Sequence, residues 1–462
     1  MKPTIAPAVT GETTTQRKLG LLTIGRKRPG FDQQWNETMR KRADEAFKAC
    51  GLAITTSDLP VVDEQTTRAA IARIKAAGCE TIVVLQPSLG NGQLVLTVSQ
   101  EWDGPIVLWA TPERAESEKV SSCSLVATHL WASALRQVKQ PYELVYGDPS
   151  DNTTRDTLRR AVAICRMTKI LQHTKAGVVG GHAPGFLNMA VDLVVLRERL
   201  GVQLQTLSLP MFLDRVRAID EKRAAEDVAR VNAARIPFGT ATPDDVAMNS
   251  RIYLAIHDLM AEEALDAVAV QCWPEMPNML GQWPYLAFSR MNDEAIPVAL
   301  EGDVDGALTL LLGNHLDAGV GYISDWLEHD ERTVHFWHPG NAALQWMNAV
   351  GSPQGPSFGK HFNIERPMVV DGPLKQNIPV TITRLWSCDG KYHLTAVEGR
   401  SIPPRRKVTG NQMLVEIPDR DCRQWFEDIC HAGLPHHVVL FNGNHRETFK
   451  RFARVANIEW MA

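Results

Sequence analysis

Short apolar runs alternate with helical patterns along the first 330 residues of the chain. In the first third, apolar runs at residues 18–24, 81–86 and 105–110 have the length of buried strands. Residues 31–50 carry the 3.6-residue period of an amphipathic helix between two of these strands. Such alternation with short connections predicts a parallel, doubly wound sheet. We place this N-terminal α/β domain at residues 1–145.

The same alternation continues through the middle of the chain, where we place a second α/β domain at residues 146–330. A long amphipathic helix at residues 151–174 is followed by apolar strands at residues 176–180 and 267–272. The second of these strands leads into an aromatic, proline-rich loop that carries Glu275.

The pattern of apolar and polar positions changes in residues 331–462, which we expect to form a β-rich domain. Strand patterns at residues 379–385, 391–398 and 413–417 are separated by turns, with no long helical pattern between them. An antiparallel barrel or a small sandwich is expected. The predicted fold class is therefore α/β, with two doubly wound parallel-sheet domains followed by a β-rich, barrel-like C-terminal domain.

One stretch near the end of the central domain carries the main candidate chemistry. A short strand at residues 297–300 ends in Glu301, a helical pattern follows at residues 304–316, and a second strand at residues 319–324 ends in Asp325. The order strand, helix, strand predicts a βαβ unit with parallel strands. Glu301 and Asp325 would then leave one sheet at the same edge, where open α/β sheets bind ligands.

The helix within this stretch has recognisable start and packing signals. Asp303 or Asp305 could cap its N-terminus. Leu308, Leu311 and Leu312 lie on one face of the predicted helix. We therefore expect a helix over residues 304–316.

Composition indicates an ordinary globular protein of 462 residues, 44% apolar and 22% charged, with a formal charge of −4. This balance gives no reason to expect nucleic acid or an anionic membrane as a partner. Eight scattered cysteines without a CxxC motif suggest reduced thiols in a cytoplasmic protein. Residues 1–16 lack the apolar core of a secretory signal, and no apolar stretch is long enough to span a membrane.

Histidines supply further candidates, above all His436 and His437 after a Gly-Leu-Pro turn. If both lie in a strand, alternation sends one ring into a site and the other elsewhere. Two carboxylates with one or two imidazoles suit a first-row divalent metal such as Mn²⁺. Such a site could move a proton between neighbouring carbons or assist hydrolysis, and the residue types leave both open. The loop at residues 181–186 could contact a phosphate or polyol, although a tight structural turn fits it better.

These motifs resemble a known family. ALEGDVDGALT followed by SDW, with Glu301 and Asp325 24 residues apart, resembles the metal-site region of L-fucose isomerase. The Glu-Gly-Asp motif and the late GLPHHVVL also resemble L-arabinose isomerase. The expected order of domains is that of the superfamily, and the chain looks like a shorter, fucose-isomerase-like member.

The resemblance implies aldose–ketose isomerisation of a free pentose, hexose or deoxysugar through a cis-enediol, dependent on Mn²⁺ or another divalent metal such as Co²⁺ or Mg²⁺. Glu301 and Asp325 would be metal ligands and the acid/base pair. His437 would be the late histidine ligand, and His338 a further one. His436 remains an alternative to His437. The family's assembly implies a homo-oligomer, a trimer or hexamer.

Two other hypotheses remain open at this point. The same scaffold could carry another metal-dependent sugar enzyme, such as a lyase or an epimerase. It could also be a sugar-binding protein without turnover, although such a protein gains little from burying two carboxylates together.

Overall fold

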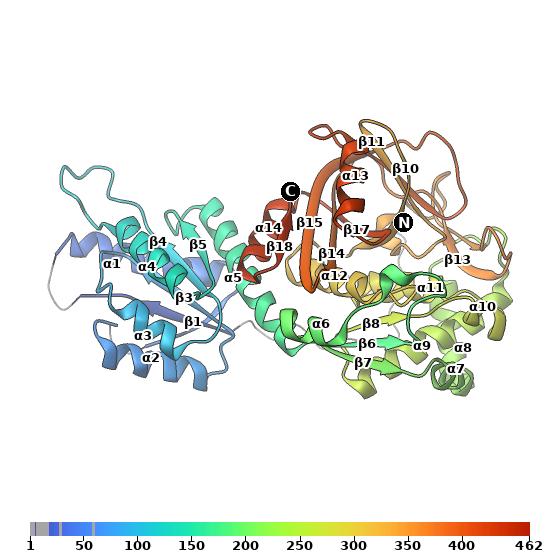
Figure 1. Ribbon diagram of the computed structural model, residues 1–462, viewed down its shortest axis with the longest axis horizontal. Helices are drawn as coiled ribbons and strands as arrows, with labels where there is room; N and C mark the ends of the chain where they lie inside the picture. Colours follow the sequence, from blue (N-terminus) through green and yellow to red (C-terminus); the bar gives the residue numbers. More distant parts are fainter. Residues whose placement is uncertain (1–4, 6–17, 27–29, 58–60) are drawn as a thin grey trace. The chain divides into compact units, whose positions relative to one another are not determined.

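The computed structural model describes residue 5 and residues 18–26, 30–57 and 61–462 (Figure 1). The expected polar start at residues 1–16 lies, apart from Ile5, outside these residues. Among the described residues, no helix combines the length and apolar character needed to cross a membrane.

The chain divides into two compact units, which are described separately. One comprises Glu12–Ile170 and Arg454–Asn457, and the other Met1–Gly11, Leu171–Ala453 and Ile458–Ala462. The division into three domains at residues 145 and 330 stays a prediction.

The first unit contains a five-stranded parallel sheet in the order β2-β1-β3-β4-β5 (Figure 1). Helices cover both of its faces. Phe47 of α1 and Cys165 of α5 pack on one face, and Ile74 of α2, Val98 of α3 and Trp131 of α4 on the other. The predicted doubly wound domain is therefore confirmed. Its strands are β1 (Lys18–Thr23), β2 (Ala53–Thr56), β3 (Thr81–Gln86), β4 (Ile106–Ala110) and β5 (Tyr142–Tyr146). Its helices are α1 (Gln33–Ala49), α2 (Glu64–Ala76), α3 (Leu94–Glu101), α4 (Ser124–Gln137) and the first part of α5 (Asn152–His173).

The second unit begins with a four-stranded parallel sheet in the order β7-β6-β8-β9. This sheet confirms the second α/β layer that the alternation predicts. Its strands are β6 (Lys175–Val179), β7 (Gln203–Leu207), β8 (Ala267–Val270) and β9 (Val298–Ala299). The helices of this part are α6 (Leu193–Leu200), α7 (Leu209–Ala218), α8 (Glu221–Ala233), α9 (Val246–Glu263), α10 (Glu275–Met279), α11 (Tyr285–Asp293) and α12 (Val304–His315).

A closed antiparallel barrel completes the second unit. Six strands pair in the order β14-β17-β10-β11-β16-β15, and β15 pairs back to β14. They are β10 (Tyr322–His329), β11 (Thr333–His338), β14 (Pro379–Cys388), β15 (Lys391–Ile402), β16 (Asn411–Glu416) and β17 (His437–Asn442). Outside the barrel lie the hairpin of β12 (Ser357–Lys360) and β13 (Pro367–Asp371), helix α13 (Cys422–His431) and most of α14 (Arg446–Val455). Strand β18 (Glu459–Met461) pairs in parallel with β15. Of the two β architectures expected, the barrel is the one formed.

The predicted βαβ unit is wrong in one respect. β9 lies in the parallel sheet, but β10 lies in the barrel, where it pairs antiparallel with β11 and β17. One physical reason is the tight turn after β10, in which Asp330 accepts hydrogen bonds from the amides of Arg332 and Thr333. This turn folds β11 back onto β10. Asp325 therefore lies within a barrel strand and not at the end of a parallel one.

Helix α12 lies between the parallel sheet and the barrel, and contacts β8 on one side and β14 and β17 on the other. All residues from Val304 to Gly313 are consequently buried, including the predicted face of Leu308, Leu311 and Leu312. Gly313 is needed for the close approach, because a Cβ there would collide with the Phe441 ring of β17. Helix α12 thus packs closely against both layers.

Candidate metal centre

The turn Glu301-Gly302-Asp303 joins β9 to α12 and places two carboxylates at the centre of the second unit. Glu301 and Gly302 have φ angles of +59° and +74°. At Gly302 a Cβ would collide with the carbonyl of Gly181, so only glycine fits this left-handed position. The turn is tied to the loop after β6 by the amide of Ala183, which donates to the Glu301 carbonyl at 2.9 Å.

The two oxygens of the Glu301 carboxylate have different environments. Oε1 accepts a hydrogen bond of 3.0 Å from Nε1 of Trp273. Oε2 is buried and lies 3.4 Å from Nε2 of His437 and 3.7 Å from Nε2 of His436. Burial alone would raise the pKa of Glu301, but the two neighbouring histidines outweigh it and hold that pKa well below its usual value. Glu301 is therefore ionised at neutral pH.

Asp325 reaches the same place from the barrel. In the strand register it lies opposite His437 on β17 and opposite Trp337 on β11. Its Oδ1 lies 3.6 Å from Nε2 of His437 and 4.0 Å from Nε2 of His436. The side chain is 31% exposed, against 9% for that of Glu301. Asp325 therefore marks the open side of the centre.

His437 is the first residue of β17 and is fully buried. Its Nδ1 lies 3.0 Å from Oδ2 of Asp303, which leaves Nε2 facing Glu301 and Asp325. Burial lowers the pKa of His437, but Asp303 and Glu301 outweigh it and raise the pKa to about 10. Without a bound cation the ring therefore carries a proton at neutral pH.

His338 ends β11 and is also buried, with its ring centroid 5.7 Å from that of His437. Burial lowers the pKa of His338 to about 4, more than the attraction of Asp325 and Glu301 raises it. This ring is neutral at physiological pH, the form in which a histidine binds a metal.

His436 lies just before β17, so strand alternation does not separate it from His437 as expected. Its Nδ1 is paired with Nδ2 of Asn188 at 3.1 Å, and its ring stands edge-on to Phe186 at 4.7 Å. The side chain is 34% exposed. His436 thus lies on the solvent-facing side of the centre, beside Asp325, whereas His437 lies at its buried end.

The donor atoms fit a divalent cation. Three buried atoms that face the centre have no hydrogen-bond partner among the described residues: Glu301 Oε2, Asp325 Oδ1 and His437 Nε2. Buried polar atoms are rarely left unpaired unless an ion or water satisfies them. Glu301, His338 and His437, and likewise Asp325, His436 and His437, offer ligand atoms within 4.8 Å of one another. Two carboxylates and imidazoles are a donor set for first-row divalent metals.

The other candidates from the sequence have different surroundings. Glu275 accepts a hydrogen bond from Gln271 at 2.9 Å and is in neither group of prospective ligands. The loop at residues 181–186 supports the Glu301 turn through Gly181 and Ala183.

Sequence reasoning missed Trp273 and Asn188, which hold Glu301 and His436 and come from loops without a motif. It assigned Asp303 only as a helix cap. That cap is confirmed, since Asp303 accepts a hydrogen bond from the amide of Gly306 at 2.8 Å.

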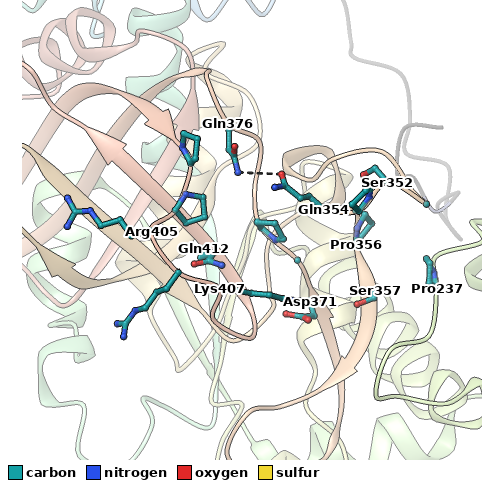
Figure 2. A pocket seen from close by; sticks show the side chains of 18 residues that line it. Pro237, Ser352, Gln354, Pro356, Ser357, Asp371, Gln376, Arg405, Lys407 and Gln412 are labelled. Carbon is teal, nitrogen blue, oxygen red and sulfur yellow. Dashed lines mark hydrogen bonds between the residues drawn. The ribbon is translucent and has the colours of Figure 1, made fainter.

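A separate cavity of about 530 Å³ lies in the same unit, beside the barrel (Figure 2). It is lined by proline- and glycine-rich loops, together with Asp371 and Lys407. Two arginines in its wall are already paired, Arg405 with Asp330 and Arg406 with Glu328. None of the residues of the metal centre lines this cavity.

Comparison with known proteins agrees with this geometry. Residues 23–172 match the family model described as fucose/sulfoquinovose isomerase, N-terminal domain. The chain is 25% identical to a sulfoquinovose isomerase of Priestia aryabhattai, over 94% of this chain and 97% of that protein. It is 22% identical to a sulfoquinovose isomerase of Alkalicoccus urumqiensis, over 95% and 97%. A third, from Clostridium sp. (strain MSTE9), is 21% identical over 82% and 86%.

The family model covers the N-terminal α/β layer, and the full-length matches extend through the parallel sheet and the barrel that together form the centre. This agreement along almost the whole length supports a fucose-isomerase-like protein, and the sulfoquinovose isomerase relatives indicate an aldose–ketose isomerase.

Proposed function

We propose that the protein is a divalent-metal-dependent isomerase that converts a free aldose into its 2-ketose. The observation that carries this proposal is the convergence of Glu301 Oε2 and Asp325 Oδ1, at 3.4 and 3.6 Å, on the unpaired Nε2 of His437. Glu301, Asp325, His437 and His338 would hold the metal, and Mn²⁺ is the first candidate. A bound ion of this kind would polarise the carbonyl and hydroxyl oxygens of the sugar.

The two carboxylates would act as the acid/base pair. One takes the proton from C2 of the open-chain aldose, and a cis-enediol forms as the O1 oxygen gains a proton. The same proton is then delivered to C1, and O2 loses its proton as the C2 carbonyl forms. The net change moves one hydrogen from C2 to C1 and one from O2 to O1. Glu301 is ionised at neutral pH, and the hydrogen bond from Trp273 to its Oε1 holds its orientation.

Access to the centre supports a substrate that enters from the side of Asp325. Asp325 and His436 are each about one-third exposed, while Glu301, His338 and His437 are buried. The reacting end of the sugar would lie over Asp325 and Glu301. His436, whose Nδ1 is taken by Asn188, would present Nε2 to a sugar oxygen.

Sulfoquinovose is the first substrate to test, because the three relatives with near-complete coverage carry that name. Purified protein would be incubated with sulfoquinovose, fucose, arabinose and glucose in the presence of Mn²⁺ or EDTA. Formation of the 2-ketose from one of these sugars, lost with EDTA, supports the proposal. We also propose a homo-oligomer, a trimer or hexamer, which light scattering would test.

A further inference from the structure

Asp303 lies directly behind His437 and is fully buried. Its Oδ2 lies 3.0 Å from Nδ1 of His437, on the side of the ring that faces away from Glu301 and Asp325. A carboxylate at this position accepts a hydrogen bond from Nδ1–H. The lone pair of the neutral ring is then on Nε2, which faces the prospective ligands.

Asp303 itself is held by three further donors. The guanidinium of Arg384, on β14, donates from Nη1 to Oδ2 and from Nη2 to Oδ1, at 2.6 and 2.7 Å. The amide of Gly306 donates to Oδ1 at 2.8 Å. Burial alone would raise the pKa of Asp303, but Arg384 and His437 outweigh it and hold that pKa well below its usual value. The carboxylate therefore stays ionised and fixed.

Gly306 is part of the same arrangement. A Cβ at this residue would collide with Oδ2 of Asp303, the oxygen that faces His437, and would crowd Nη1 of Arg384. The observed position of the carboxylate is thus open only because residue 306 has no side chain. The need for glycine at position 306 is separate from helix capping, because the cap uses the other oxygen of Asp303, Oδ1.

From these contacts we propose that Asp303 is a positioning residue: held by Arg384 and the first turn of α12, it fixes the ring and tautomer of His437 so that Nε2 is presented to the metal. The inference rests on the proposed function, in which His437 is a ligand.

Asp303→Asn is the direct test, because no orientation of the amide satisfies all four donors. If NH₂ replaces Oδ2, it faces both Arg384 and Nδ1 of His437. If it replaces Oδ1, it faces both Arg384 and the Gly306 amide. We expect Mn²⁺ affinity, measured by calorimetric titration and by the electron paramagnetic resonance of free Mn²⁺, to fall about 10- to 100-fold. Asp305→Asn is the matched control, since Asp305 is a buried acid on the same helix that contacts Tyr392 and not His437.

A second pair of variants covers the case in which Asp303→Asn does not fold. Gly306→Ala displaces Asp303 without removing a charge, and should also weaken Mn²⁺ binding at least tenfold. Gly313→Ala produces a comparable collision seven residues further along the same helix, with the ring of Phe441 and not with the Asp303 carboxylate. If destabilisation of α12 were the whole effect, both alanine variants would lose affinity equally, and the proposal would be overturned.

The results separate this inference from the proposed function. Wild-type protein that binds no divalent metal contradicts the proposed function itself. Wild-type protein that binds Mn²⁺, together with a folded Asp303→Asn variant of unchanged affinity, contradicts only the role of Asp303. Loss of affinity in Asp303→Asn and Gly306→Ala, with Asp305→Asn and Gly313→Ala near wild type, supports both.

Discussion

Glu301 and Asp325 approach one ring nitrogen, Nε2 of His437, from two different sheets, at 3.4 and 3.6 Å. Glu301 follows the last strand of the parallel sheet, while Asp325 and His437 lie opposite each other on neighbouring barrel strands. The centre therefore forms only where the parallel sheet and the barrel meet across α12. Folding of both layers is a precondition for any chemistry there.

Replacement of Glu301 by Gln should leave the fold intact and reduce kcat by about 10²- to 10⁴-fold, since an amide cannot carry the proton. The measurement is ketose formation under saturating sugar and Mn²⁺. Glu275→Gln is the control, because Glu275 is a half-buried acid in the same unit that is in neither ligand group. Substantial activity in Glu301→Gln would remove Glu301 from the acid/base role.

Replacement of His437 and replacement of His436 should affect different properties, Mn²⁺ affinity in the first case and KM in the second. His437→Ala removes a buried donor with no other partner for Nε2, and should weaken Mn²⁺ binding at least about tenfold. His436→Ala removes a ring that is about one-third exposed, on the solvent-facing side of the centre. This variant should mainly raise KM, with Mn²⁺ affinity close to that of the wild type. Mn²⁺ titrations and steady-state kinetics on both variants show which of the two histidines is the metal ligand. The reverse pattern would transfer the ligand role to His436.

Metal binding should release about one proton near pH 7.5. In the metal-free protein the pKa of His437 is about 10, so the ring is protonated there, and it must lose the proton to bind a metal. Affinity should therefore rise about tenfold per pH unit until the pH approaches 10. Calorimetry in buffers of different ionisation enthalpy measures the released protons. His437→Ala should abolish the release, and an equal release in that variant would assign the proton elsewhere.

Asp305 should limit stability above neutral pH. Burial raises its pKa from 3.8 to about 7, although Arg384 partly offsets this. An acid whose pKa is raised by folding costs stability as the pH rises from 3.8 to 7, and the cost is complete above 7. For a shift of this size it is on the order of 4 kcal/mol. Asp305→Asn cannot ionise and keeps an acceptor for Tyr392. Its melting temperature should exceed that of wild type at pH 8 and match it near pH 4; equal melting temperatures at both pH values would contradict this account.

Much of the fold could be predicted from the sequence because its elements are locally determined. Strands β1, β3 and β4 are marked by apolar runs, α12 by an Asp cap and the start of β17 by a Gly-Leu-Pro turn, and each lies close to its expected position. Which sheet a strand joins depends on distant partners, and for this reason β10 was misassigned. Its neighbours β11 and β17 pair with it from opposite sides, and β17 lies more than 100 residues along the chain.

In the candidate site too, the residues in local motifs could be predicted, and those that act through distant contacts could not. Glu301, Asp325, His338 and His437 were candidates from their motifs, and the structure brings all four together. Trp273, Asn188 and Arg384 were not, because each acts through one contact with a residue 28 to 248 positions away. Nothing in the local pattern of a tryptophan, asparagine or arginine indicates such a contact.

The most direct test of the central claim is conversion of sulfoquinovose and the other aldoses with Mn²⁺, with and without EDTA, followed by detection of the 2-ketose. We predict ketose formation from at least one sugar, its loss with EDTA and its recovery on addition of Mn²⁺. Ketose formation that persists in fully metal-stripped protein would contradict a metal-dependent isomerase at this centre, and so would the absence of ketose from every sugar despite tightly bound metal.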